Sequence, residues 1–106
     1  MKKIYLFCSA GMSTSMLASK MQKVADGHNL PIKVAAFPEG KLGEIIANDR
    51  PDCILLGPQV KYMYDATVAN YGKEGIPIAV IDAADYGMMN GEKVLKTAIK
   101  LIKENK

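Results

Sequence analysis

Cys8 has the surroundings expected of a nucleophile that reacts with phosphorus. It follows a short apolar run, residues 4–7, and precedes a stretch of small and polar residues that reaches Ser15. We expect the apolar run to form a buried strand and a helix to begin near residues 13–15. Backbone N–H groups at such a connection point into one concavity that binds anions. A thiolate in that concavity could attack a phosphoryl group and hold the product.

The predicted phosphate-binding loop consists of the seven residues after Cys8. They are Ser9, Ala10, Gly11, Met12, Ser13, Thr14 and Ser15. The dipole of the following helix should favour the thiolate of Cys8 over the thiol, and the hydroxyl groups of the loop add hydrogen-bond donors. The alternative is that Cys8 is a small buried hydrophobic residue and that the serines and threonine only cap the helix.

The spacing after Cys8 matches a phosphatase signature except at one position. That signature has a cysteine, five residues, an arginine, and then serine or threonine. Here the sixth residue after Cys8 is Thr14, followed by Ser15. The arginine normally binds the transferring phosphoryl oxygens and lowers the barrier to the next step. Its absence predicts a phosphocysteine that persists until a partner accepts the group.

The other residues capable of such chemistry are expected to lie away from Cys8. Arg50, the only arginine, precedes the third expected strand, and His28, the only histidine, follows the first helix. Both should therefore lie at the amino-terminal edge of the sheet. Cys53 falls early in the third strand, on the order of 10 Å from Cys8. We interpret Cys53 as a core cysteine, out of reach of a disulfide with Cys8.

Composition indicates one small globular domain, residues 1–106. The chain is 49% hydrophobic and 24% charged, with a formal net charge of +3, which does not favour nucleic-acid binding. The apolar run before Cys8 is shorter than that of a signal peptide, and no stretch reaches the length of a membrane span. We therefore expect a cytoplasmic protein with reduced cysteines and with neither metal nor cofactor.

Strands alternate with helices along the chain. Strands are expected at residues 4–7, 32–37, 52–56 and 78–81, separated by helices, with a loop at 82–91 before a last helix. Gly27 is expected to be the left-handed cap of the first helix. This order predicts an α/β fold with a four-stranded parallel sheet in the order 2-1-3-4 and helices on both faces. Ligands of such sheets bind at the carboxyl ends of the strands, where the strand order reverses, and Cys8 lies there.

Residues 5–15 closely resemble the phosphorylation loop of IIB components of the phosphotransferase system (PTS), in the lactose/cellobiose/diacetylchitobiose family. Residues 36–39, 55–60, 80–82 and 86–87 are also similar to that family. The resemblance implies a fold like that of low-molecular-weight tyrosine phosphatases. It also implies that Cys8 accepts a phosphoryl group from a phosphohistidine of the IIA component. Cys8 would then pass the group to a sugar, such as cellobiose or chitobiose, held by the membrane component IIC.

A docking surface for these partners is expected around the Cys8 loop. Its candidate residues are Met12, Tyr62, Tyr86, Met88 and Met89. Flexible thioether side chains suit a surface that meets more than one partner. Asp82 is interpreted as a cap rather than a base, and whether Asp82 or Gln59 contributes to the site stays open. The lysines of the last helix are interpreted as a solvated face, and the alternative is contact with anionic lipid near a membrane partner.

Three other functions compete with the carrier hypothesis. A phosphatase- or arsenate-reductase-like thiol enzyme would use the same scaffold but needs the missing arginine or a nearby second cysteine. A receiver-type signalling domain needs an acceptor aspartate after the third strand, where this chain has Gly57. A nucleotide-binding module needs a glycine-rich phosphate loop after the first strand, and neither of the two common patterns occurs.

Overall fold

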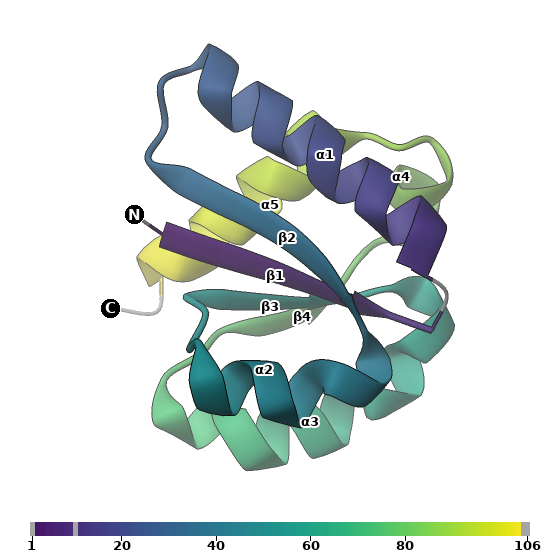
Figure 1. Cartoon of the computed structure of the whole chain (residues 1–106), viewed down its shortest axis with the longest axis vertical. Coiled ribbons are helices and arrows are strands. Elements are labelled where there is room, and N and C mark those ends of the chain that lie inside the picture. Colours follow the sequence, from purple (N-terminus) through teal and green to yellow (C-terminus); the bar gives the residue numbers. More distant parts are fainter. Residues whose placement is uncertain (1, 10, 105–106) are drawn as a thin grey trace.

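The computed structural model describes residues 2–9 and 11–104, which form a parallel four-stranded sheet between two layers of helices (Figure 1). The strands are β1 (Lys2–Cys8), β2 (Ile32–Pro38), β3 (Cys53–Leu56) and β4 (Ile78–Val80). Their order is β2-β1-β3-β4, and every neighbouring pair is parallel. The predicted fold class and strand order are therefore confirmed.

The helices cover both faces of the sheet, as Figure 1 shows. On one side lie α1 (Gly11–Gly27) and α5 (Gly91–Glu104), and on the other α2 (Leu42–Asn48) and α3 (Tyr64–Tyr71). A short helix, α4 (Ala83–Gly87), precedes α5. The described residues also contain three 3-10 segments: η1 (Glu39–Lys41), η2 (Pro58–Met63) and η3 (Gly72–Glu74).

β1 divides its side chains between two apolar cores. Ile4 and Leu6 pack into the core beneath α1 and α5, whereas Tyr5 and Phe7 pack into the core beneath α2 and η2. All four are buried. Successive side chains of a strand point to opposite faces, so a continuous apolar run is what a strand covered on both faces requires. This burial fixes the position of Cys8 at the end of the strand.

Three local predictions were wrong. α1 begins at Gly11, not near residues 13–15, so most of the predicted loop forms the first turn of the helix. The left-handed residue after α1 is Asn29 (φ 55°), not Gly27, because asparagine also tolerates this conformation. The segment at 82–91 is not only a loop, since Asp82 caps the short helix α4.

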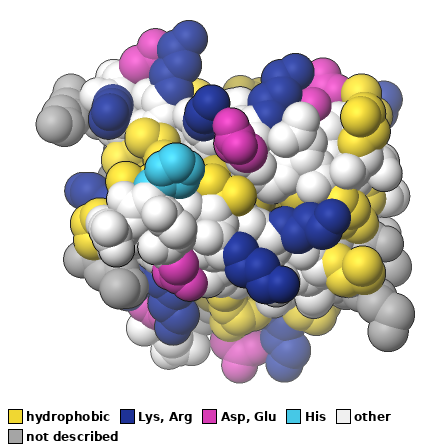
Figure 2. Space-filling view, turned by 90° about the horizontal axis from the view of Figure 1, so that it is seen from above, with side chains coloured by type: hydrophobic (Ala, Val, Ile, Leu, Met, Phe, Trp, Pro, Cys, Tyr) yellow, Lys and Arg dark blue, Asp and Glu magenta, His cyan; other side chains and the backbone are white. Residues whose placement is uncertain are grey.

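The face made by α1 and α5 carries scattered charges around a small apolar hollow. Figure 2 shows this face, with the His28 side chain beside the hollow, which Val24, Leu30 and Ile99 help to line. All four lysines predicted to form a solvated stripe are exposed: Lys93, Lys96, Lys100 and Lys103. Lys93 pairs with Asp85 and Lys96 pairs with Glu92, and the exposure of all four lysines is consistent with a solvated face.

Candidate active site

The sheet brings the segment after each strand to one edge. In the register of the sheet, Cys8 is opposite Pro38 of β2, and Phe7 is opposite Leu56 of β3. η2 follows β3, and α4 follows β4 at the same edge. β1 lies between β2 and β3, where the strand order reverses, which is the usual binding position in such sheets.

The sulfur of Cys8 lies in a small polar cluster. Cys8 Sγ donates a hydrogen bond to Gln59 Oε1 at 3.3 Å, and it lies 3.7 Å from the hydroxyl oxygen of Tyr86. That hydroxyl is also hydrogen-bonded to Thr14 Oγ1 at 3.0 Å. Cys8 and Thr14 are fully buried and Tyr86 is 8% exposed. Residues from four separate elements thus form one polar cluster that includes the sulfur.

Gly57 allows the backbone after β3 to approach this cluster. A Cβ atom at position 57 would lie 3.1 Å from Cys8 Sγ and 3.1 Å from Gln59 Oε1. The backbone there is extended, with φ of −64° and ψ of 153°, so glycine is required by the close approach and not by its torsion angles. Any side chain here would push Cys8 and Gln59 apart.

The residues of the predicted phosphate-binding loop fall in different places. Ser9 is an exposed bend between β1 and α1, and Ser15 is exposed on α1. Thr14 is buried, and its hydroxyl contacts Tyr86. Ala10 lies outside the described residues, as do the side chains of Met12 and Ser13. The backbone from Gly11 to Ser15 nevertheless lies in the first turns of α1, so an N-terminal helix end follows Cys8.

In the predicted docking surface, Tyr86 is buried rather than exposed, and Met89 is only partly exposed. Tyr86 is buried against Cys8, and Met89 packs against the core beneath α1 and α5. The helix α4 explains the burial of Tyr86, because one helical turn separates Asp82 from Tyr86 and directs the ring inward. Tyr62 and Met88 are exposed as expected, at 71% and 77%.

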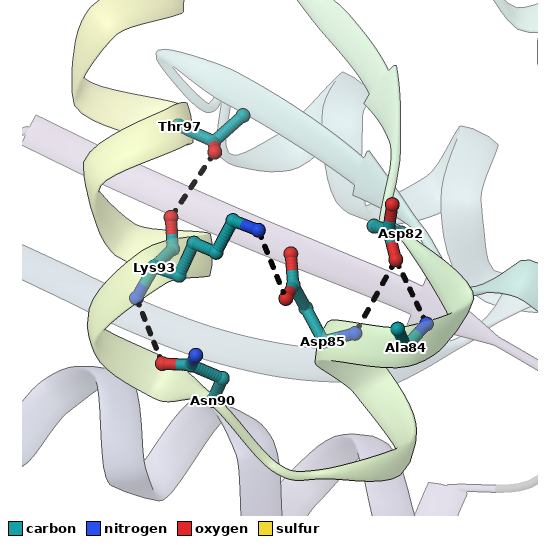
Figure 3. Close-up of polar contacts among 6 residues, drawn as sticks. All are labelled: Asp82, Ala84, Asp85, Asn90, Lys93 and Thr97. Carbon is teal, nitrogen blue, oxygen red and sulfur yellow. Dashed lines mark hydrogen bonds and ion pairs between the residues drawn. The ribbon is translucent and has the colours of Figure 1, made fainter.

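Sequence reasoning did not identify Tyr86 as a neighbour of Cys8 and left Gln59 undecided. Asp82 was the available signal, since an aspartate after a strand predicts a helix start and hence an inward residue one turn later. The structure confirms the cap: Asp82 Oδ1 accepts hydrogen bonds from the N–H groups of Ala84 at 2.8 Å and Asp85 at 3.4 Å (Figure 3).

The two residues excluded by position are indeed distant from Cys8. Arg50 lies at the amino-terminal end of β3, where its guanidinium donates to Glu74. His28 follows the carboxyl end of α1. Within residues 2–9 and 11–104, no cluster of three or more histidine, cysteine, aspartate or glutamate residues could hold a metal ion.

Cys53 is a core residue, as predicted. It is fully buried on β3, opposite Ile4 of β1. Ile4 precedes Cys8 by four residues along β1. Burial raises the pKa of the Cys53 thiol to about 12, with a smaller contribution from the charge of Asp52. This thiol is therefore protonated at neutral pH and is a poor nucleophile.

We predict that Cys53 does not react with iodoacetamide in the folded protein. At pH 8 a thiol with a pKa of about 12 is ionised in only about one molecule in 10⁴. Alkylation of a Cys8→Ser variant should therefore be at background at pH 8 and become complete after denaturation, as measured by peptide mass mapping. Rapid labelling of Cys53 in the folded variant would contradict the burial described here.

The fold and the site define a class of α/β proteins with a cysteine at the carboxyl end of the first strand, next to a helix N-terminus. Comparison with known proteins identifies the family. The family described as "PTS system, Lactose/Cellobiose specific IIB subunit" matches residues 3–97. This chain belongs to that family, and the resemblance found in the sequence is confirmed.

Several relatives match nearly the whole chain, and their names specify different sugars. The cellobiose-specific EIIB component of Lactococcus lactis subsp. lactis (strain IL1403) is 41% identical over 104 residues, which are 95% of this chain and 96% of that protein. The galactose-specific EIIB component of Lactococcus lactis subsp. cremoris (strain MG1363) shows the same identity and coverage. The solution structure of a cellobiose-specific IIB component from Borrelia burgdorferi superposes with a TM-score of 0.79 at 40% identity, covering 98% of this chain and 94% of that one.

A further relative is much longer than this chain. The lactose-specific EIICB component of Streptococcus mutans is 31% identical over 83 residues, which are 78% of this chain but 14% of that protein. Among the described residues of the present chain, no helix combines the length and the apolar character needed to cross a membrane.

Proposed function

We propose that this IIB protein carries a phosphoryl group on Cys8 between a IIA component and a sugar bound to a membrane IIC component. The observation that supports this most strongly is the position of the Cys8 sulfur, at the end of β1 and immediately before the N-terminal turn of α1. A phosphoryl dianion on that sulfur would meet the positive end of the helix dipole and unpaired N–H groups of its first turn.

The proposed reaction has two in-line displacements at phosphorus. The Cys8 thiolate attacks a phosphohistidine of IIA, so an S–P bond forms while the N–P bond breaks, and the electron pair stays on the imidazole nitrogen. A sugar hydroxyl then attacks the phosphocysteine: an O–P bond forms, the S–P bond breaks, and the electron pair returns to sulfur. The proton of the hydroxyl is released as the sugar phosphate forms.

The loop from Ser9 to Ser15 is proposed to bind the phosphoryl oxygens through its backbone N–H groups and hydroxyls. No arginine is available at this edge, because Arg50 is the only one in the sequence and lies at the other end of the sheet. Without an arginine to stabilise attack by water, phosphocysteine should last long enough for the sugar to reach it.

The sugar is proposed to be a β-linked disaccharide such as cellobiose or chitobiose. The cellobiose-specific relatives support this proposal. An equally similar galactose-specific relative indicates that the chain's overall sequence does not determine the sugar, which is consistent with recognition by IIC. The EIICB relative supports a IIC partner, and we propose that the chain works in the cytoplasm and meets the membrane through IIC.

We predict negligible phosphatase activity. The purified protein should turn over aryl phosphates no faster than its Cys8→Ser variant, because the position of the phosphatase arginine is occupied by Thr14. Release of aryl alcohol, followed by absorbance, measures this directly. Steady multiple turnover that requires Cys8 would favour a thiol phosphatase over a carrier.

We predict that the exposed apolar residues beside the site contact IIA. Met88→Asp should slow phosphoryl transfer from IIA by about tenfold, because it removes an exposed apolar contact and places a negative charge near an incoming dianion. Lys100→Asp, on exposed α5, serves as the control and should leave the rate within about twofold. NMR shifts on adding IIA that centre on α5 would contradict this docking surface.

A further inference from the structure

The hydrogen bonds around Cys8 have only one consistent direction while the thiol is protonated. The single proton of Cys8 is used in the bond to Gln59 Oε1, because this oxygen can only accept. The sulfur can then only accept from Tyr86, whose hydroxyl must therefore be the donor at 3.7 Å. Since that hydroxyl has one proton, it must accept from Thr14 at 3.0 Å.

A directed chain of donors therefore runs from Thr14 through Tyr86 and Cys8 to the amide oxygen of Gln59. We propose that the Tyr86 hydroxyl, oriented by Thr14, donates to Cys8 Sγ and stabilises negative charge on the sulfur, so that Tyr86 promotes formation of the reactive thiolate. This role rests on the proposed function of Cys8. A hydroxyl that donates to an anion forms a stronger bond than one that donates to a neutral thiol.

α4 holds Tyr86 firmly enough for this role. Asp82 caps the helix, Asp85 of α4 pairs with Lys93 of α5 at 3.5 Å, and Asn90 Oδ1 accepts from the N–H of Lys93 at 3.2 Å (Figure 3). The ring of Tyr86 also belongs to the core beneath α1 and α5. The position of its hydroxyl is thus set by both packing and polar contacts.

The charged side chains of the neighbouring elements are exposed or have partners of their own. The first acidic or basic residue of α1 is Lys20, at an exposed position two turns beyond the start of the helix. Glu39 of η1 accepts from Tyr62, and Lys61 of η2 is exposed. The carboxylates of Asp82 and Asp85 have the partners described above. The hydroxyl oxygen of Tyr86 lies 3.7 Å from the sulfur, and the proposal rests on this contact.

Gln59, in its present orientation, favours the protonated thiol of Cys8 rather than the thiolate. Its Oε1 stabilises the protonated thiol by accepting the S–H proton at 3.3 Å. When that proton leaves, an oxygen faces an anion, and a half-turn of the amide would present Nε2 as a donor instead. The amide can therefore serve either state of Cys8, whereas the directed hydroxyl of Tyr86 favours the anion.

The test measures the rate of Cys8 alkylation against pH in a Cys53→Ser background, where Cys8 is the only thiol. Tyr86→Phe should move the midpoint of this profile upward by about 0.5–1 pH unit. Thr14→Val, which keeps the shape but removes the hydroxyl, should move it upward by a smaller amount. The matched control is Tyr5→Phe, since Tyr5 is also buried and its hydroxyl donates to Asp49 away from the site.

If Tyr86 had a purely structural role, Tyr86→Phe would lower the thermal stability of the Cys53→Ser protein but would not shift the midpoint of its alkylation profile. An unchanged or lower midpoint in Tyr86→Phe would therefore overturn the proposal. If Tyr86→Phe fails to fold, as judged by circular dichroism, the Thr14→Val profile decides by the same criterion. A failure of Cys8 to accept a phosphoryl group would refute the carrier function instead, and it is measured separately from the alkylation profile.

Discussion

Replacing Cys8 by serine is expected to abolish phosphoryl acceptance by this protein. The substitution changes one atom in a fully buried position, so the fold should be retained. A serine hydroxyl stays protonated at neutral pH and is a weak nucleophile, whereas a thiol beside a helix N-terminus ionises readily. The rate of label transfer from phosphorylated IIA should fall to background.

Cys53→Ser is the matched control for this experiment, because it makes the same chemical change at a core position on β3. The variant should still accept one phosphoryl group, although the buried hydroxyl will cost some stability. If a folded Cys53→Ser protein no longer accepted the phosphoryl group, or if Cys8→Ser still accepted it, Cys8 would not be the nucleophile.

A second large effect is expected at Gly91, where α5 begins against α1. A Cβ atom at position 91 would lie 3.0 Å from the backbone carbon and the Cβ of Lys20 and 3.0 Å from the backbone nitrogen of Met21. Because the backbone of a packed helix moves at a cost, Gly91→Ala should lower the free energy of unfolding by about 1–3 kcal/mol. The midpoint of thermal unfolding should fall by roughly 5–15 °C.

Gly27→Ala provides the comparison for that effect. A Cβ atom at position 27 meets no atom within 4 Å, so this substitution should be neutral or stabilising by up to about 1 kcal/mol. Equal stabilities of the two variants in thermal unfolding would mean that α1 and α5 do not approach as closely as described.

The fold could be predicted from the sequence because its signals are strong. The apolar run ending at Cys8 and the regular alternation of strands and helices define a parallel sheet, and right-handed crossovers then restrict the strand order. The boundaries were less certain. Small residues such as Gly11 are compatible with both a loop and a first helical turn, so the sequence did not reveal that α1 starts there.

The candidate site was predicted only in part. A cysteine between a strand and a helix is recognisable from local sequence, as is the aspartate that caps α4. The contact of Tyr86 with Cys8 joins residues 78 positions apart. It depends on a five-residue helix after β4, and local sequence signals for so short a helix are weak. Tyrosine occurs both at docking surfaces and in cores, so the residue type alone did not show that Tyr86 would be buried.

Intact mass spectrometry tests most directly whether Cys8 carries the phosphoryl group. The protein should be incubated with phosphoenolpyruvate and a phosphotransferase mixture that contains IIA. We predict a gain of about 80 Da, one phosphoryl group, in the wild-type protein and in Cys53→Ser but not in Cys8→Ser. An unchanged wild-type mass, or a gain that persists in Cys8→Ser, would contradict the account.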